Sequence, residues 1–155
     1  MDLRKNLQTD RVGQLQAAEA LCVQPGDTIA AALALMRQNP GAGCVLVCDR
    51  KRLVGIFTER DVLRIIAQGG DLAEPVSSVM TAQPATIRAD ATVGQAVLQM
   101  HRGGYRRLPV VSAGGEPTGV IQTKNVVHYL VEHFPSSVYN LPPVPQATAR
   151  DREGA

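Results

Sequence analysis

The feature that most constrains this chain is an internal repeat with a spacing of 64 residues and no gap. Six identical pairs mark it: Thr28 and Thr92, Ala32 and Ala96, Met36 and Met100, Val47 and Val111, Gly55 and Gly119, and Val62 and Val126. A repeat of this length is one supersecondary unit used twice, and such units bury their apolar faces against each other. The chain is therefore expected to fold as two copies of one unit with a single compact core.

Composition supports an aliphatic globular core and argues against nucleic acid as a partner. The 155 residues suffice to bury about 70% of the unfolded surface, and 45% of them are hydrophobic. The net charge is only +2, whereas duplex binding requires a strong basic excess. Aromatic residues make up 3% of the chain, which provides no platform on which the bases of a single strand could stack.

The cysteines and the N-terminal residues argue against a disulfide-stabilised, secreted or membrane-spanning protein. Three cysteines predict no disulfide framework. Cys44 and Cys48 share one face of a predicted strand about 13 Å apart, too far for a bridge or a shared metal, and are expected to be buried free thiols. Residues 1–10 lack the apolar core of a signal peptide, and no apolar run is long enough to span a membrane. We expect a cytoplasmic protein that binds no metal.

Hydrophobic periodicity predicts the same order of elements in each copy: strand, helix, strand, strand, helix. The first helix of each copy begins after Thr28 or Thr92, and Asn39-Pro40-Gly41 or Gly103-Gly104 ends it. The predicted strands are 21–24, 44–48, 53–57, 85–88, 108–112 and 118–121, and the closing helices are 59–68 and 123–133. In these closing helices the residues expected to face the core are Val62, Ile65, Ile66, Val126, Val127 and Leu130.

The repeat and the changes in composition divide the chain into five segments. We expect an N-terminal segment at 1–11, the first repeat at 12–70, a linker at 71–78 and the second repeat at 79–134. The segment 135–155 contains four prolines and many small or polar residues, which is typical of a tail. The fold class is α/β (α+β), with two β-α-β-β-α repeats.

One motif connects this architecture to a known family. The second strand of the first repeat continues into its helix as Gly55-Ile56-Phe57-Thr58-Glu59-Arg60-Asp61. A β-α-β-β-α unit that contains Gly, two hydrophobic residues and Thr-x-x-Asp resembles the CBS domain, and a tandem pair resembles a Bateman module. Arg107-Leu108-Pro109-Val110-Val111 adds to the resemblance, which covers roughly residues 12–134. It implies two repeats packed about a pseudo-twofold axis, with two clefts between them.

Two interpretations of Thr58 and Asp61 follow. Thr-x-x-Asp at a helix start is a capping box, which contributes about 1 kcal/mol and needs no ligand. A helix N-terminus is also an anion site, and a carboxylate can accept the hydroxyls of a ribose. The resemblance implies that Thr58 and Asp61 hold the phosphate side and the ribose of an adenine nucleotide.

The resemblance also implies that each cleft takes phosphate-binding charge from the opposite repeat. Arg106, Arg107 and Lys124 of the second repeat would serve the Asp61 cleft, since arginine binds phosphate in a bidentate manner. A solvated loop is the alternative for Arg106 and Arg107. Arg60, which corresponds to Lys124 in the repeat, completes the basic set. Val23 and Val45 are expected to form the apolar wall for adenine.

The second cleft lacks these groups. Gln122 stands where the first repeat has Thr58, and Asn125 stands where it has Asp61. The segment facing this cleft, Pro40-Gly41-Ala42-Gly43, carries no charge. We therefore expect one competent nucleotide site per chain.

The function expected from this resemblance is that of a regulatory module. It would bind an adenosyl nucleotide such as AMP, ADP or ATP, require no cofactor, and signal to a partner protein. No acid–base pair or phosphate-binding glycine loop is present in the sequence, so no enzymatic activity is expected. The alternative is an assembly module without a ligand, in which Thr58 and Asp61 only cap a helix. The resemblance implies a homodimer in either case.

Overall fold

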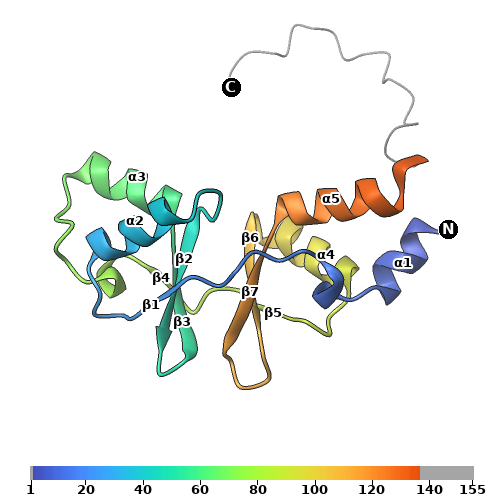
Figure 1. The fold of residues 1–155 in the computed structure, drawn as a ribbon, viewed down its shortest axis with the longest axis horizontal. Helices are drawn as coiled ribbons and strands as arrows, with labels where there is room; N and C mark the ends of the chain where they lie inside the picture. Colours follow the sequence, from blue (N-terminus) through green and yellow to red (C-terminus); the bar gives the residue numbers. More distant parts are fainter. Residues whose placement is uncertain (1, 137–155) are drawn as a thin grey trace, which may run out of the picture.

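The computed structural model describes residues 2–136, which form two lobes side by side (Figure 1). The helices are α1 (Leu3–Thr9), α2 (Ile29–Gln38), α3 (Glu59–Gln68), α4 (Val93–Gly103) and α5 (Thr123–His133). The strands are β1 (Cys22–Val23), β2 (Cys44–Asp49), β3 (Arg52–Thr58), β4 (Thr81–Ala82), β5 (Ile87–Arg88), β6 (Arg107–Val111) and β7 (Pro117–Gln122). The tail expected at 135–155 lies outside the described residues, apart from its first two.

Each lobe contains a small sheet with two helices against it, as the repeat predicts. The first sheet has the order β1-β2-β3-β4 and the second the order β5-β6-β7. In both, a short strand pairs in parallel with the first strand of an antiparallel hairpin. The prediction of two α/β repeats of the same topology is confirmed, and both closing helices have the predicted bounds.

The segments 12–18 and 76–82, near the starts of the two repeats, each pack on the opposite lobe. Val12 is 1% exposed in the core of the second lobe, and Val76, within the segment expected to be a linker, is fully buried in the core of the first. The strand β4 likewise extends the first sheet by pairing with β3, and Ala18 forms a bridge with Val120. The two repeats are therefore interlocked rather than joined by a free linker.

The core has three parts rather than the single one expected from the repeat, because each sheet has two buried faces. One cluster lies between each sheet and its helices, and a smaller cluster lies where the two sheets face each other. Alternation along β2 creates this division: Val45 and Val47 face the helices of the first lobe, while Cys44 and Leu46 face the second lobe. The contact between the sheets is thus built from aliphatic and thiol side chains.

Two residues expected to face the core are exposed. Ile66 on α3 is 67% exposed, and Val127 on α5 is 52% exposed. Each follows a residue that does pack inward or against the core, and a step of one residue turns a side chain by about 100° around the helix. Since each closing helix presents only one stripe to its sheet, the prediction for Ile66 and Val127 was wrong.

A short N-terminal helix, which the sequence did not predict, lies on the second lobe. The backbone of α1 approaches α4 closely, since a Cβ added at Gly94 would lie 2.7 Å from the carbonyl oxygen of Leu7. The backbone N of Val93 donates to the carbonyl of Asp10 at 2.9 Å. Leu3 and Leu7, one helical turn apart, pack against the core of the second lobe, and two apolar positions in one short helix are too few for periodicity to predict it.

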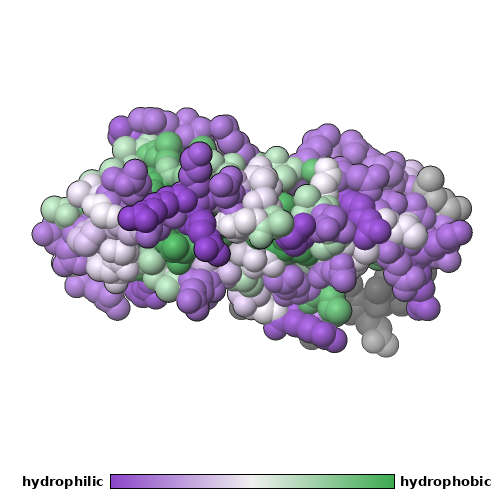
Figure 2. Space-filling model, turned by 90° about the horizontal axis from the view of Figure 1, so that it is seen from below, coloured by the Kyte–Doolittle hydropathy of each residue, from purple (hydrophilic) through white to green (hydrophobic). Residues whose placement is uncertain are grey.

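The surface on the side of the two hairpin turns is mostly hydrophilic in both lobes, with separate hydrophobic patches (Figure 2). Within residues 2–136 no helix is both long enough and apolar enough to cross a bilayer.

The contact between Tyr129 and Asp10 gives a prediction for alkaline pH. The Tyr129 phenol donates a hydrogen bond to the Asp10 carboxylate and is 5% exposed. Burial, together with the Asp10 carboxylate, raises the pKa of Tyr129 to about 12 from an ordinary 10. The folded chain therefore holds this proton more tightly, and its contribution to stability, complete below pH 10, is lost as the pH rises towards 12.

Urea unfolding of wild type and Tyr129→Phe between pH 9 and pH 12 checks this. We expect the wild type to lose more stability over the range than the variant. The comparison cancels the contributions of the buried thiols and of other groups that titrate there. Equal losses in both proteins would contradict the assignment.

Candidate functional site

The two motif residues of the first repeat, Thr58 and Asp61, are bonded to each other at the start of α3. Thr58 ends β3 and is the N-cap of the helix. Its backbone N and its hydroxyl donate to Oδ2 of Asp61 at 2.8 and 3.0 Å. Asp61 is 7% exposed, which is rare for a carboxylate without partners. The capping box, one of the two interpretations of Thr58 and Asp61, is thus formed. The same two residues lie at the helix N-terminus, where the other interpretation places an anion.

A further residue, Arg64, contacts this carboxylate. Its Nη2 lies 2.9 Å from Oδ1 of Asp61 and also donates to the carbonyl of Val79 at 3.2 Å. Sequence reasoning missed this residue. The signal was available, because a residue three positions after Asp61 on a predicted helix lies next to it on the helix surface.

Arg107 of the second repeat reaches across to the first repeat beside α3. Its Nε donates to the carbonyl of Ala42 at 3.2 Å, and its Nη2 lies 3.9 Å from Oε2 of Glu59, the first residue of α3. The guanidinium lies against the backbone of Gly43: a Cβ there would be 1.9 Å from Nη2. The fold therefore places an arginine of one repeat at the helix N-terminus that contains Asp61.

The uncharged loop 40–43 provides the space for this approach. Gly41 and Gly43 have positive φ angles of 86° and 66°, which favour glycine. Lys124 lies close to Gly41, since a Cβ there would be 3.8 Å from its Nζ. The loop expected to leave the second cleft poor in charge thus lies against basic side chains of the second repeat.

The remaining residues expected at the site lie differently. Arg60 and Arg106 are exposed, and no side-chain hydrogen bond or ion pair involves either within residues 2–136. Val23 and Val45 are 8% and 0% exposed and pack in the core between the first sheet and its helices. The structure thus brings Arg107 and Lys124 against the loop 40–43, and Arg107 also lies beside the start of α3, the helix that contains Asp61. The two valines lie in the core of the first lobe.

The second repeat has the same cap with different chemistry. The backbone N of Gln122 donates to Oδ1 of Asn125 at 2.7 Å. The Gln122 side chain is buried and donates to the carbonyls of Gly41 and Ala42 at 3.2 and 3.3 Å. Its amide therefore joins the repeats at the position where the first repeat has a threonine hydroxyl.

The two buried thiols, Cys44 and Cys48, have raised pKa values. Cys44 and Cys48 are free and buried, as expected, while Cys22 is free and exposed. Burial raises the pKa of Cys44 to about 11, against the lowering effect of the nearby Arg107 guanidinium. Burial and the Cys22 thiol raise the pKa of Cys48 to about 12. Both thiols are protonated at neutral pH, and residues 2–136 contain no cluster of His, Cys, Asp or Glu that could hold a metal ion.

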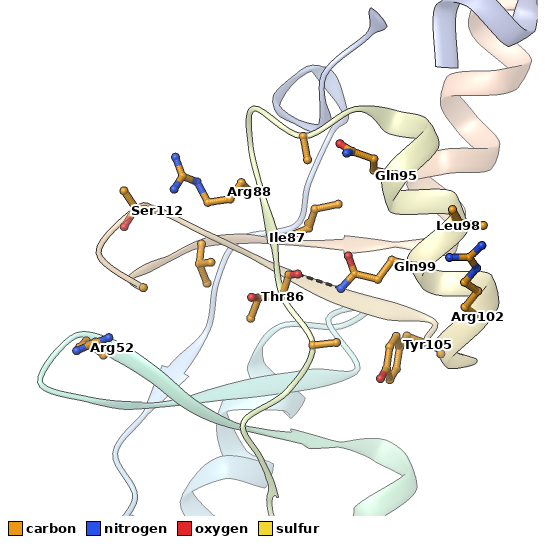
Figure 3. A pocket seen from close by; sticks show the side chains of 16 residues that line it. Arg52, Thr86, Ile87, Arg88, Gln95, Leu98, Gln99, Arg102, Tyr105 and Ser112 are labelled. Carbon is orange, nitrogen blue, oxygen red and sulfur yellow. Dashed lines mark hydrogen bonds between the residues drawn. The ribbon is translucent and has the colours of Figure 1, made fainter. Parts of the chain in front are cut away.

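A separate groove of about 930 Å³ runs along β5 and α4 of the second lobe (Figure 3). Its lining includes Arg52, Arg88 and Arg102 together with Tyr105, and no carboxylate. A second groove, at positions related to the first by the repeat, is lined by both acidic and basic residues. None of the residues expected to bind the nucleotide lines this arginine groove. The sequence did not predict the groove, because its three arginines are distant from one another in the chain.

Comparison with known proteins gives the family. A family model described as CBS domain matches residues 12–68 and 76–132. An uncharacterised 17.7 kDa protein of Acidianus ambivalens is 29% identical over 122 residues, covering 79% of this chain and 74% of that protein. Among solved structures, the CBS domain protein PAE2072 from Pyrobaculum aerophilum, complexed with AMP, is 26% identical with a TM-score of 0.70, covering 79% of this chain and 98% of that one.

A second solved structure, CBSX2 in complex with AMP, supports the fold alone, since it is 24% identical. Its TM-score is 0.70, and the match covers 79% of this chain and 97% of that chain. Both copies of the 64-residue repeat are therefore matched by known domains.

Proposed function

The chain belongs to the CBS domain family and carries two such domains, and we propose that it is a regulatory module that binds an adenosyl nucleotide such as AMP, ADP or ATP. The observation that carries the proposal is the approach of Arg107 to the first turn of α3, where Asp61 lies. The similar protein PAE2072, which is complexed with AMP, supports the ligand class. Binding to one cleft per chain is proposed, since only the first repeat has a carboxylate at this position.

Each residue has a distinct role in this proposal. Asp61 accepts hydrogen bonds from the ribose hydroxyls. Thr58, the N-cap of α3, lies on the phosphate side of the ligand. Arg107, Arg106 and Lys124 bind the phosphates through charge-assisted hydrogen bonds and neutralise their charge. Arg60 adds positive charge from the exposed face of α3. Val23 and Val45 act only from the core behind the cleft, because neither has a substantial exposed surface.

The regulatory step is a population shift. A ligand held by both repeats stabilises the arrangement of the two lobes that fits it best. The segments 12–18 and 76–82, which pack on the opposite lobes, carry such a change into both sheets. We propose that a partner protein in the cytoplasm reads this change, and that the chain acts by binding rather than by catalysis.

Thermal unfolding with a panel of AMP, ADP, ATP, NAD and S-adenosylmethionine, followed by calorimetric titration, tests the proposal. At least one adenosyl compound is expected to raise the melting temperature, because a ligand that binds only the folded state stabilises it. Calorimetry should give about one site per chain. Flat melting curves with every compound would favour the ligand-free assembly module instead.

The outer faces of α3 and α5 suit the homodimer that the family resemblance implies. Leu63 and Ile66 on α3 are 69% and 67% exposed, and Val127, which the repeat relates to Leu63, is 52% exposed. Large apolar side chains gathered on a surface are typical of an interface. We propose that a second copy of the chain covers them.

Light scattering after size-exclusion chromatography checks the dimer. The double variant Leu63→Asp with Val127→Asp is expected to be a monomer, because buried unpaired carboxylates oppose association. Leu98→Asp is the matched control, since Leu98 is 45% exposed on α4, where it lines the groove along β5 and α4. A wild-type chain that is already monomeric would contradict the prediction.

A further inference from the structure

The Asp61 carboxylate is almost fully occupied by protein donors. Oδ2 accepts two hydrogen bonds from Thr58, and Oδ1 accepts one from Arg64. An ionised carboxylate has about four acceptor positions, so these three bonds leave roughly one position free. The vicinal diol of a ribose donates two hydrogen bonds. At least one protein donor must therefore leave before both hydroxyls can bind.

Arg64 is the donor that leaves at the lowest cost. The Thr58 amide belongs to the helix cap, and the Thr58 hydroxyl also accepts a hydrogen bond from the first turn of α3. The Arg64 side chain is 55% exposed, so water can solvate its guanidinium once it leaves. An ion pair with one exposed partner contributes little net stability.

Arg64 also connects Asp61 to the start of the second repeat. The same Nη2 that contacts Asp61 donates to the carbonyl of Val79 at 3.2 Å. Val79 directly follows the 3-10 turn Val76–Ser78, and β4 begins two residues later and pairs with β3. Movement of this guanidinium away from Asp61 therefore also affects the segment that leads into the second repeat.

The second repeat has no such connection. The repeat relates Arg64 to His128, which lies 2.9 Å from Oε1 of Glu132 instead of contacting Asn125. Asn125 accepts a hydrogen bond only from the backbone of Gln122 within the described residues. The contact between an arginine and the capping residue is thus specific to the repeat that has the carboxylate.

We propose that Arg64 competes with the ligand ribose for Asp61, and that its release on binding frees the carbonyl of Val79 and loosens the segment 76–82. The proposal rests on the proposed function and adds a regulatory connection to it. Ligand occupancy is then transmitted through one side chain to the segment shared by the two repeats.

The first test compares AMP with 2′,3′-dideoxy-AMP on wild type and Arg64→Met, which removes the donor while keeping an extended side chain. The preference for AMP over the dideoxy compound is expected to increase roughly 3- to 10-fold in the variant, the size of one hydrogen bond to a charged group. Loss of positive charge affects both ligands equally and cancels in this ratio. Arg37→Met, an exposed arginine on α2, should leave the ratio unchanged.

The second test is hydrogen exchange of the Val79 and Met80 amides, which both donate to the carbonyl of Val76. AMP should accelerate their exchange in wild type, and Arg64→Met should show the accelerated exchange without ligand. The proposal would be overturned if Arg64→Met left the preference for AMP over the dideoxy compound unchanged or reduced, and left the exchange of the Val79 and Met80 amides unchanged. Arg64 would then only stabilise the helix. If wild type binds no AMP, the proposed function fails, while the ligand-free exchange of the variant still tests the connection to Val79.

Discussion

Replacing Asp61 with asparagine is expected to weaken AMP binding about 100-fold. A neutral amide has one acceptor oxygen instead of two and lacks the charge that strengthens hydrogen bonds from the ribose hydroxyls. Losing two such bonds costs roughly 3 kcal/mol, and each 1.4 kcal/mol or so is a factor of ten in affinity. Calorimetric titration of wild type and Asp61→Asn with AMP measures the effect.

The asparagine variant is chosen because the second repeat shows that asparagine can serve this cap. Asn125 accepts a hydrogen bond from the backbone N of Gln122 at 2.7 Å. The Asp61→Asn protein should therefore stay folded, with a loss of about 1 kcal/mol at most from the helix start. Asn125→Ala is the matched control and should leave AMP affinity unchanged. Equal affinity of wild type and Asp61→Asn would show that the site assignment is wrong.

Replacing Gly43 with alanine is expected to weaken AMP binding about 10-fold by moving Arg107. A Cβ at this position would lie 1.9 Å from Nη2 and 2.6 Å from Cζ of Arg107, so the whole guanidinium must shift. The φ angle of 66° adds roughly 1 kcal/mol of strain for a residue with a side chain. Losing one arginine contact to a phosphate corresponds to about a tenfold change in affinity.

Two comparisons separate these effects for Gly43→Ala. Gly69 has the same φ of 66° with no atom within 4 Å of an added Cβ, so Gly69→Ala measures the backbone strain alone by urea unfolding. Adenosine has no phosphate, and its affinity should be unchanged in Gly43→Ala. A loss of adenosine affinity equal to the loss for AMP would show that Arg107 does not act on the phosphate.

The elements most fully predicted from the sequence are those whose signals are local. The helix Glu59–Gln68 was predicted with its bounds because a capping motif begins it and Gly69, at positive φ, ends it. The strands β2 and β3 were predicted from a continuous apolar run and a polar turn. The short strands β1 and β5 came out two residues long, since pairing with a neighbour, rather than their own composition, decides where they end.

Prediction failed where the answer depended on packing partners. Ile66 was placed in the core because it is apolar, but the sheet covers only the stripe that contains Ile65. For Val45, expected to form an adenine wall, only the fold shows that strand alternation turns it towards the helices of the first lobe while Cys44 faces the other lobe, and its role at the site stays a prediction. A period of two gives alternate faces, but it does not say which face meets which neighbour.

The sequence by itself determined that two homologous units fold together and that only the first has a carboxylate at the helix start, because repetition and residue identity are properties of the chain. The tertiary structure alone decided that Arg107 lies against Gly43, that Gln122 joins the repeats, and that Arg64 occupies Asp61. Arg107 and Gly43 are 64 positions apart in the sequence and equivalent in the repeat. They meet because the pseudo-twofold packing of the lobes brings equivalent positions together near its axis, a contact that exists only once both copies have folded.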